Sequence, residues 1–226
     1  MEELNKTLQM TGKNALYILH TLNFRLKLLN FSRRRQFAFT PPQNDYGGGD
    51  AKPSLYPVLR LLLPYLDRDR GAYGIKESVL ADLYIDFLQL GKKSYDAQKL
   101  KNFRTPKNNS VNQGDFAETL HSVIRDRSYG DSKMTVAEVN DFLDDIVTTN
   151  AEEGRRGVTS LLKTVFKKMN DTQQKWLVRI ILKDNMRTGM GSTSIFKSFH
   201  PDAKGVYDVN ANLRKVCELL NNPEKR

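Results

Sequence analysis

The sequence predicts an all-α protein. From Pro53 onward the apolar residues recur every three to four positions, which is the period of helices with one buried face. No window alternates polar and apolar residues as a half-buried strand does. The 226 residues are enough for one sizeable helical domain. We therefore expect an irregular multi-helix domain without a sheet.

The front of the chain does not share this pattern. An apolar stretch at 15–31 is interrupted by polar residues and has no cleavage site, which argues against a signal peptide. Arg33-Arg-Arg follows, and then the Pro- and Gly-rich run that starts at Thr40. We expect residues 1–53 to be a divergent N-terminal arm with a Pro/Gly-rich linker, or the product of a mis-joined exon, and 54–226 to be the helical domain.

Nine helices are expected in that domain. Pro57 and Pro64 predict that the first one is kinked or stops early. Thr135 and Glu138 have the spacing of a capping box, and Asp115 places a negative charge at the positive end of a helix. The expected ranges are 55–66, 77–90, 94–103, 115–127, 135–149, 157–169, 172–184, 193–200 and 205–221.

The charge of the chain favours a polyanionic partner. Its 36 Lys and Arg residues exceed 26 Asp and Glu, which gives a net charge of +10. The excess is segregated: residues 51–110 carry 11 basic and 6 acidic side chains, 154–226 carry 15 and 6, and 111–153 carry 3 and 10. One basic face for phosphates and an acidic face turned away from it would explain this distribution.

The segment 172–203 concentrates the candidate binding residues. Lys175, Arg179 and Lys183 lie four apart, which predicts an exposed basic stripe on the helix side opposite an apolar face. Arg187-Thr-Gly-Met-Gly ends that helix, and Ser192-Thr-Ser supplies N-cap residues for the next. A Gly-rich turn before a helix N-terminus is suited to a phosphate. The competing interpretation is an ordinary helix connection with a solvated basic face.

Catalytic and metal-binding patterns are missing from the sequence. The three histidines are scattered, and Asp141, Asp144 and Asp145 share a helical face that is more simply a solvated acidic one. There is no G-x-x-x-x-G-K-[ST] and no G-x-S-x-G. Cys217 is expected to be a small core residue, and no apolar run is long enough for a membrane span. We expect no metal and no cofactor in this chain.

A series of distinctive segments follows in one register over about residues 54–221. They are Arg70-Gly-Ala-Tyr-Gly-Ile-Lys-Glu, Asp96-Ala-Gln-Lys-Leu-Lys-Asn-Phe-Arg-Thr-Pro, Gly114-Asp-Phe-Ala, Val139-Asn-Asp-Phe-Leu-Asp, Lys175-Trp-Leu-Val-Arg-Ile-Ile-Leu-Lys-Asp, Phe199-His-Pro-Asp-Ala and Leu213-Arg-Lys-Val-Cys. Together they resemble the N-terminal DNA-binding domain of eukaryotic ATP-dependent DNA ligase IV. The family's adenylation motif, K-x-D-G, is absent, and Lys76 lacks its context. We therefore expect no lysine–AMP adduct on this chain.

The resemblance implies a division of labour. The family's helical domain grips duplex DNA across the minor groove, whereas catalytic and OB domains, expected to be absent here, use ATP and magnesium to seal the nick. It also implies a nuclear role in double-strand break repair by non-homologous end joining. The nuclease Artemis would dock on the N-terminal domain, and a coiled-coil scaffold partner would bind a tandem BRCT region that is not in this sequence.

The expected partner is thus duplex DNA, bound without sequence preference, and no membrane. The expected DNA-binding residues are Lys175, Arg179, Lys183, Arg187, Thr188, Gly189, Gly191, Ser192, Thr193, Arg104, Thr105 and Lys107. The alternative is a non-catalytic helical scaffold whose basic face binds an acidic protein or RNA, since both functions need Lys and Arg.

Overall fold

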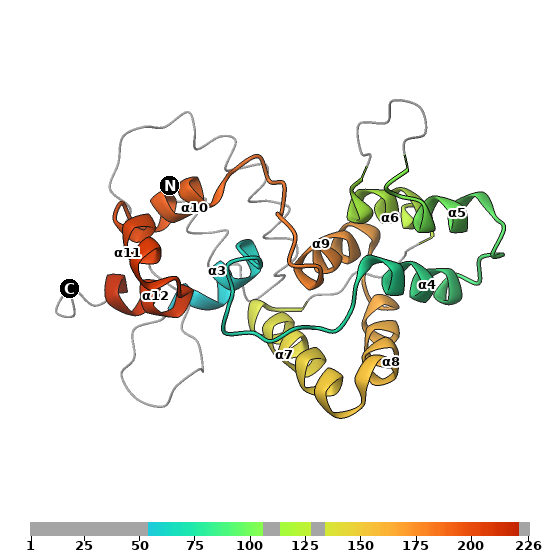
Figure 1. Ribbon diagram of the computed structural model, residues 1–226, viewed down its shortest axis with the longest axis horizontal. Helices are drawn as coiled ribbons and strands as arrows, with labels where there is room; N and C mark the ends of the chain where they lie inside the picture. The colour runs from blue at the N-terminus through green and yellow to red at the C-terminus, as the bar shows by residue number, and fades with distance from the viewer. Residues whose placement is uncertain (1–53, 106–113, 128–133, 222–226) are drawn as a thin grey trace. The chain divides into compact units, whose positions relative to one another are not determined.

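The computed structural model describes residues 54–105, 114–127 and 134–221. Within these ranges the chain forms ten α-helices and no β-strand (Figure 1), so the predicted all-α class is confirmed. The helices are α3 (Tyr56–Leu62), α4 (Glu77–Phe87), α5 (Tyr95–Lys101), α6 (Phe116–Ile124), α7 (Val136–Glu152), α8 (Gly154–Phe166), α9 (Asp171–Ile181), α10 (Ser192–Phe199), α11 (Ala203–Asn210) and α12 (Leu213–Asn221). The expected arm and linker, residues 1–53, lie outside the described ranges.

Side chains at the helix starts explain several boundaries. The Thr135 N–H donates to Glu138 Oε2 at 2.6 Å, and the Glu138 N–H donates to Thr135 Oγ1 at 3.2 Å, so the predicted capping box is confirmed. Asp115 Oδ1 accepts the Glu118 N–H at 3.2 Å and begins α6, as its acidic position predicts. Free backbone donors at both helix starts are thereby satisfied.

Several predicted ranges differ from the observed ones by about three residues at one or both ends, as 157–169 does from Gly154–Phe166, and three differences have a visible cause. The first helix stops at Leu62, two residues before Pro64, so it is shorter than 55–66. The helix predicted at 172–184 ends at Ile181, and Lys183 has a left-handed φ of 49°. The single helix predicted at 205–221 is two helices, because Ala211 also takes a left-handed φ of 49° between them.

The described residues divide into two compact units. The first contains residues 54–70, 134–141 and 185–221, and the second contains residues 71–105, 114–127 and 142–184. In the first unit α12 packs on α3 and α11, and α11 packs on α10 (Figure 1). Its core side chains include Leu59, Phe196, Val216 and Cys217, all at most 1% exposed.

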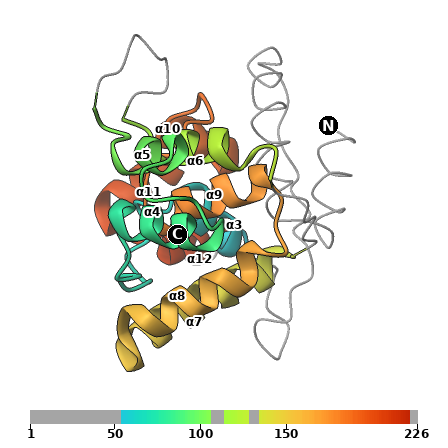
Figure 2. The same ribbon diagram turned by 90° about the vertical axis from the view of Figure 1, so that its right-hand side faces the viewer.

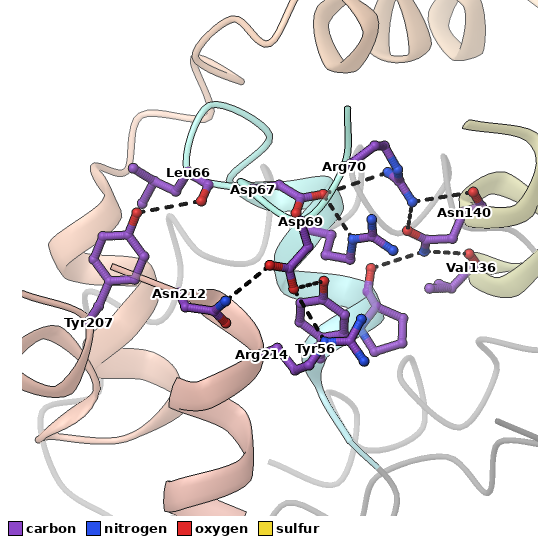
Figure 3. A network of polar contacts seen from close by, with 12 residues as sticks. Tyr56, Leu66, Asp67, Asp69, Arg70, Val136, Asn140, Tyr207, Asn212 and Arg214 are labelled. Atoms are coloured by element: carbon purple, nitrogen blue, oxygen red, sulfur yellow. Dashed lines mark hydrogen bonds and ion pairs between the residues drawn. The ribbon is translucent and has the colours of Figure 1, made fainter. Parts of the chain in front are cut away.

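A polar network holds α3, α12 and the segment after α3 together in the first unit (Figure 3). The Tyr56 hydroxyl donates to Asp69 Oδ2 at 2.8 Å, and the Asn212 amide donates to Asp69 Oδ1 at 3.0 Å. The Arg214 guanidinium lies 4.7 Å from the centre of the Tyr56 ring. Buried Arg70 donates to Asn140 Oδ1 at 2.8 Å, which ties this segment to α7.

The second unit is built around Tyr84. Its ring stacks on Phe166 with centroids 4.8 Å apart, and its hydroxyl donates to Gln174 Oε1 at 3.0 Å. The Gln174 amide in turn donates to the Phe166 and Met169 carbonyls at 3.1 and 2.8 Å. Helices α4, α8 and α9 are therefore linked by one buried cluster whose polar atoms are paired, while α5 and α6 continue the packing from α4 to α9 (Figure 2).

Candidate nucleic-acid interface

Helix α9 presents its apolar face to the core, as predicted. Trp176, Leu177, Ile180 and Ile181 are each at most 3% exposed. The helix begins with a capping box that the sequence analysis missed: Asn170 Oδ1 accepts the Gln173 N–H at 2.9 Å, and Gln173 Oε1 accepts the Asn170 N–H at 3.0 Å. The Asn-x-x-Gln spacing in the sequence could have located it.

Arg179 is not on an exposed stripe, and that part of the prediction is wrong. It is 1% exposed and its Nη2 atom lies 2.6 Å from Asp115 Oδ2 and 3.3 Å from Glu118 Oε1. Its Nη1 atom lies 3.7 Å from Asp184 Oδ2. Because α6 packs on α9, Asp115 and Glu118 at the start of α6 lie beside α9 and bind this guanidinium in the interior. The spacing of Lys175, Arg179 and Lys183 in the sequence could not predict these carboxylate partners.

The two lysines of the expected stripe also differ from one another. The Lys175 ammonium lies 2.6 Å from Glu118 Oε1 and 5.1 Å from the centre of the Trp176 ring, with a side chain that is 15% exposed. Lys183 lies beyond the end of α9, with its ammonium 5.9 Å from the centre of the Tyr73 ring. The stripe is therefore not a continuous row on one helix. Whether either lysine contacts DNA stays a prediction.

The connection between α9 and α10 is anchored by alternate side chains. Met186 and Thr188 are 2% and 3% exposed, whereas Asn185, Arg187 and Gly189 between and beside them are exposed. Arg187 takes a left-handed φ of 48°, and its N–H donates to Asn185 Oδ1 at 3.0 Å. Two buried anchors thus hold the chain so that Arg187 is presented to solvent.

The start of α10 leaves two backbone donors available. Gly191 is the N-cap, so the expectation that Ser192 caps the helix is wrong and Ser192 is instead its first residue. The Gly191 carbonyl accepts from Ser194 and Ile195 at 3.0 and 3.2 Å. Within the part of the chain that the structure describes, the Ser192 and Thr193 N–H groups have no hydrogen-bond partner.

The two glycines of this turn have different conformations. Gly189 has a φ of 79°, which L-residues rarely adopt, whereas Gly191 has a φ of −77° and a ψ of 165°. A Cβ atom added to Gly191 would meet no atom within 4 Å. A positive φ therefore explains why glycine is required at position 189 but not at position 191. Gly191 instead leaves open space beside the N–H groups of Ser192 and Thr193.

The remaining expected residues lie after α5. Arg104 is exposed, with its Nη2 atom 2.7 Å from Glu77 Oε1 and its guanidinium over the Phe103 ring at 5.1 Å. Thr105 is exposed, and its N–H donates to the Asn102 carbonyl at 2.9 Å. Lys107 lies outside the described residues. Arg104 and Thr105 belong to the second unit, together with Lys175, Arg179 and Lys183, whereas residues 187–193 belong to the first.

The described residues contain no group of three or more His, Cys, Asp or Glu that could hold a metal ion. The His121 imidazole instead pairs with Asp171, with 3.0 Å between Nε2 and Oδ2, and His200 Nδ1 accepts the Asp202 N–H at 3.1 Å. Cys217 is fully buried, and burial raises the pKa of its thiol to about 12. None of the described helices has the length and apolar character that crossing a bilayer requires.

A family model and individual relatives both match this chain to DNA ligases. The family model described as "DNA ligase N terminus" matches residues 27–200, a range that begins inside the expected N-terminal arm. The chain is 42% identical over 174 residues to a DNA ligase 4 of Gallus gallus, which covers 77% of this chain and 19% of that protein. The corresponding identity to the DNA ligase 4 of Homo sapiens is 40%, with the same coverage. The DNA ligase 4 of Arabidopsis thaliana is 41% identical over 180 residues, 77% of this chain and 14% of the relative. The chain thus spans a fifth or less of the length of these relatives.

Proposed function

Because this chain belongs to the family of the DNA ligase N terminus, we propose that it binds duplex DNA through the sugar–phosphate backbone and without sequence preference. In this proposal it is the DNA-gripping part of a ligase of the DNA ligase 4 type. The net charge of +10 supports such a partner, because neutralised phosphates supply most of the affinity in non-specific binding.

The free N–H groups that begin α10 are the observation that carries the proposal. The positive end of a helix macrodipole and two unpaired backbone donors favour an anion at this point. Gly191 adds no Cβ beside them, and the exposed Arg187 precedes them by only a few residues. An arginine can contact a phosphate through two donors at once. Residues 187–193 are thus assigned as a phosphate clamp.

The resemblance extends the proposal to the biological setting. We assign the duplex contact to the minor-groove side, and the role to double-strand break repair by non-homologous end joining in the nucleus. ATP and magnesium would act in other parts of a full-length ligase. A nuclease partner such as Artemis stays a prediction of the resemblance, and so does a scaffold partner outside this sequence. None of these assignments is needed for the clamp itself.

The clamp is tested with Arg187→Ala against the matched control Lys197→Ala, which removes an exposed cation from α10. Fluorescence anisotropy with several unrelated duplexes measures affinity at a series of salt concentrations. We expect Arg187→Ala to weaken binding to all of them alike and to reduce the salt slope by about one. The control should change little. An unchanged affinity of Arg187→Ala for duplex DNA at low salt would contradict the assignment of residues 187–193 as a phosphate clamp.

The scaffold alternative is tested in the same assay. Single-stranded DNA and RNA of equal length are compared with the duplex at matched salt. Tighter binding of RNA than of the duplex, or no binding of any nucleic acid, would favour a helical scaffold for an acidic partner instead.

A further inference from the structure

Helix α8, Gly154–Phe166, carries charges of one sign only. Its sequence, G-R-R-G-V-T-S-L-L-K-T-V-F, contains no Asp or Glu, and Lys167 and Lys168 follow it directly. Arg155, Arg156, Lys167 and Lys168 are exposed, and Lys163 is partly exposed. Among the described residues, none of these five cations has an ion-pair partner. The cations Lys175 and Arg179 of α9, by contrast, are paired with carboxylates.

The outer side of α8 carries the cations Arg156, Lys163 and Lys167 together with hydroxyl groups, and Arg155 is exposed at the start of the helix, in line with Val158 and Leu162. Ser160 and Thr164 are exposed and Thr159 is partly exposed between the cations. No large hydrophobic residue of this helix is exposed, since the three that the described chain exposes lie elsewhere. The Thr159 hydroxyl donates to the Arg155 carbonyl at 2.8 Å and the Thr164 hydroxyl to the Ser160 carbonyl at 3.3 Å, so the ammonium and guanidinium groups are the main side-chain donors left for phosphates.

The position of the two arginines is not explained by helix stability. Arg155 and Arg156 lie in the first turn, which contains no acidic residue, and the N-cap residue Glu153 forms no described ion pair with either of them. The positive end of the macrodipole repels cations there, whereas it favours Lys163, Lys167 and Lys168 near the other end. A residue choice that opposes local stability without a compensating contact is expected at functional positions.

The opposite side of α8 fixes the helix in the second unit. Val158, Leu162 and Phe166 are at most 1% exposed, and Phe166 stacks on Tyr84. Gly157 is also buried, and a Cβ atom there would collide with the Glu153 side chain and lie 2.7 Å from Thr149 Cγ2 of α7. The outer cations are therefore carried on a packed helix, which Figure 2 shows along its length. At a rise of about 1.5 Å per residue, the cations within the helix, from Arg155 to Lys163, extend over roughly 12 Å, and Lys167 and Lys168 follow its end.

We propose that the outer face of α8 is a second contact surface for the phosphate backbone of duplex DNA, separate from residues 187–193. A protein partner fits this face poorly, because protein interfaces use aromatic and apolar anchors in a water-free centre. Single-stranded nucleic acid fits it poorly as well, because such sites stack bases on aromatic rings. A duplex backbone needs only the cations present here. The inference rests on the proposed duplex binding and adds a surface to it.

The test is the full chain with Arg155→Gln, Arg156→Gln and Lys163→Gln together. The matched control removes three exposed cations of the same unit that likewise have no described ion-pair partner, Lys76→Gln, Lys92→Gln and Lys93→Gln. Both variants lose the same charge. Affinity for a duplex of about 20 base pairs is measured against salt, and thermal unfolding reports on folding.

The α8 variant should bind the duplex at least about tenfold more weakly at low salt, with a salt slope reduced by about two to three, while the control stays near the original slope. Its Tm should be unchanged or higher, because two cations leave the positive end of the helix. Equal losses in both variants, or a loss in neither, would overturn the second surface. Arg187→Ala, measured in parallel, distinguishes the proposed duplex binding from the α8 surface. If the original chain binds no duplex, both proposals are wrong. If only Arg187→Ala loses affinity, the α8 surface alone is wrong.

Discussion

At the scale of single residues, Arg179 shows how a cation changes its role with its surroundings. It stabilises the second unit as the centre of three carboxylates, Asp115, Glu118 and Asp184. Removing one partner of a buried ion pair leaves an uncompensated charge, which typically costs about 3–5 kcal/mol. We therefore expect Arg179→Met to lower the free energy of unfolding by several kcal/mol in a denaturant titration.

Lys175 provides the control for that experiment, because it shares Glu118 with Arg179. Its side chain is 15% exposed, against 1% for Arg179, so its charge keeps more contact with water and its ion pair is less costly to break. Lys175→Met should therefore cost much less than Arg179→Met. Equal costs for the two variants would show that burial is not what makes the Arg179 pairs important.

Cys217 allows a second test at this scale, since it is the only cysteine of the chain. Burial raises the pKa of its thiol to about 12, and the thiolate is the reactive form. At pH 8 the folded chain should react very slowly with a thiol reagent such as iodoacetamide, and unfolded chain should react at once. The folded state favours the neutral thiol, so this group stabilises folding below its unfolded pKa and loses that contribution as pH rises toward 12.

Rapid labelling of the folded chain at pH 8, at a rate that does not depend on denaturant, would contradict the core assignment of Cys217. The sequence had indicated this assignment correctly, because Leu213, Val216 and Leu220 place the cysteine on an apolar helical face. Buried cysteine of this kind behaves as a small hydrophobic residue.

At the scale of elements, the sequence located helices better than their ends. Thr135 with Glu138 and the acid at Asp115 gave correct starts, because capping is local chemistry. The break at Ala211 could not be predicted, since neither Gly nor Pro marks it. Packing of α12 on α3 and α11 places the chain reversal there, so tertiary contacts decide what the local sequence does not.

The break at Ala211 leads to a stability prediction. A left-handed φ of 49° costs an L-residue about 1–2 kcal/mol, whereas Gly adopts it freely but loses more chain entropy. Ala211→Gly should therefore raise the free energy of unfolding by up to about 1 kcal/mol. The control Ala151→Gly, at an exposed position in the last part of α7, should lower it slightly. A loss in Ala211→Gly as large as in the control would mean that the strain is relieved in solution.

The connection to α10 permits a sharper separation of stability from binding. Gly189→Ala forces an L-residue to a φ of 79°, and should cost about 1 kcal/mol of stability. Gly191→Ala meets open space at a φ of −77°, so it should leave stability nearly unchanged. Its methyl group would nevertheless lie beside the free N–H groups and should weaken duplex binding. Comparison of Tm with duplex affinity checks both variants, and a Gly191→Ala chain that binds as tightly as the original would contradict the clamp.

At the scale of the whole molecule, the sequence predicted the fold class and the apolar faces but not the state of each cation. Periodicity identifies which side of α9 is buried, as Trp176 and Leu177 show. It does not identify a carboxylate that arrives from another helix, as Asp115 does at Arg179. The cations of α8 show the converse, because only the structure reveals that Arg155 and Arg156 are exposed and have no described ion-pair partner.

The segregation of charge leads to a prediction for the complete chain. Basic side chains are in excess at 51–110 and at 154–226, and acidic ones at 111–153. Phosphate contacts release condensed counterions, so the logarithm of the binding constant should fall linearly with the logarithm of salt concentration. With about five phosphates neutralised, the slope should lie near −4 to −5. Unrelated duplexes should give the same slope, because backbone contacts carry no sequence information. A slope close to zero in this titration would contradict binding through phosphate contacts. Slopes that differ widely between duplex sequences would instead indicate contacts to the bases.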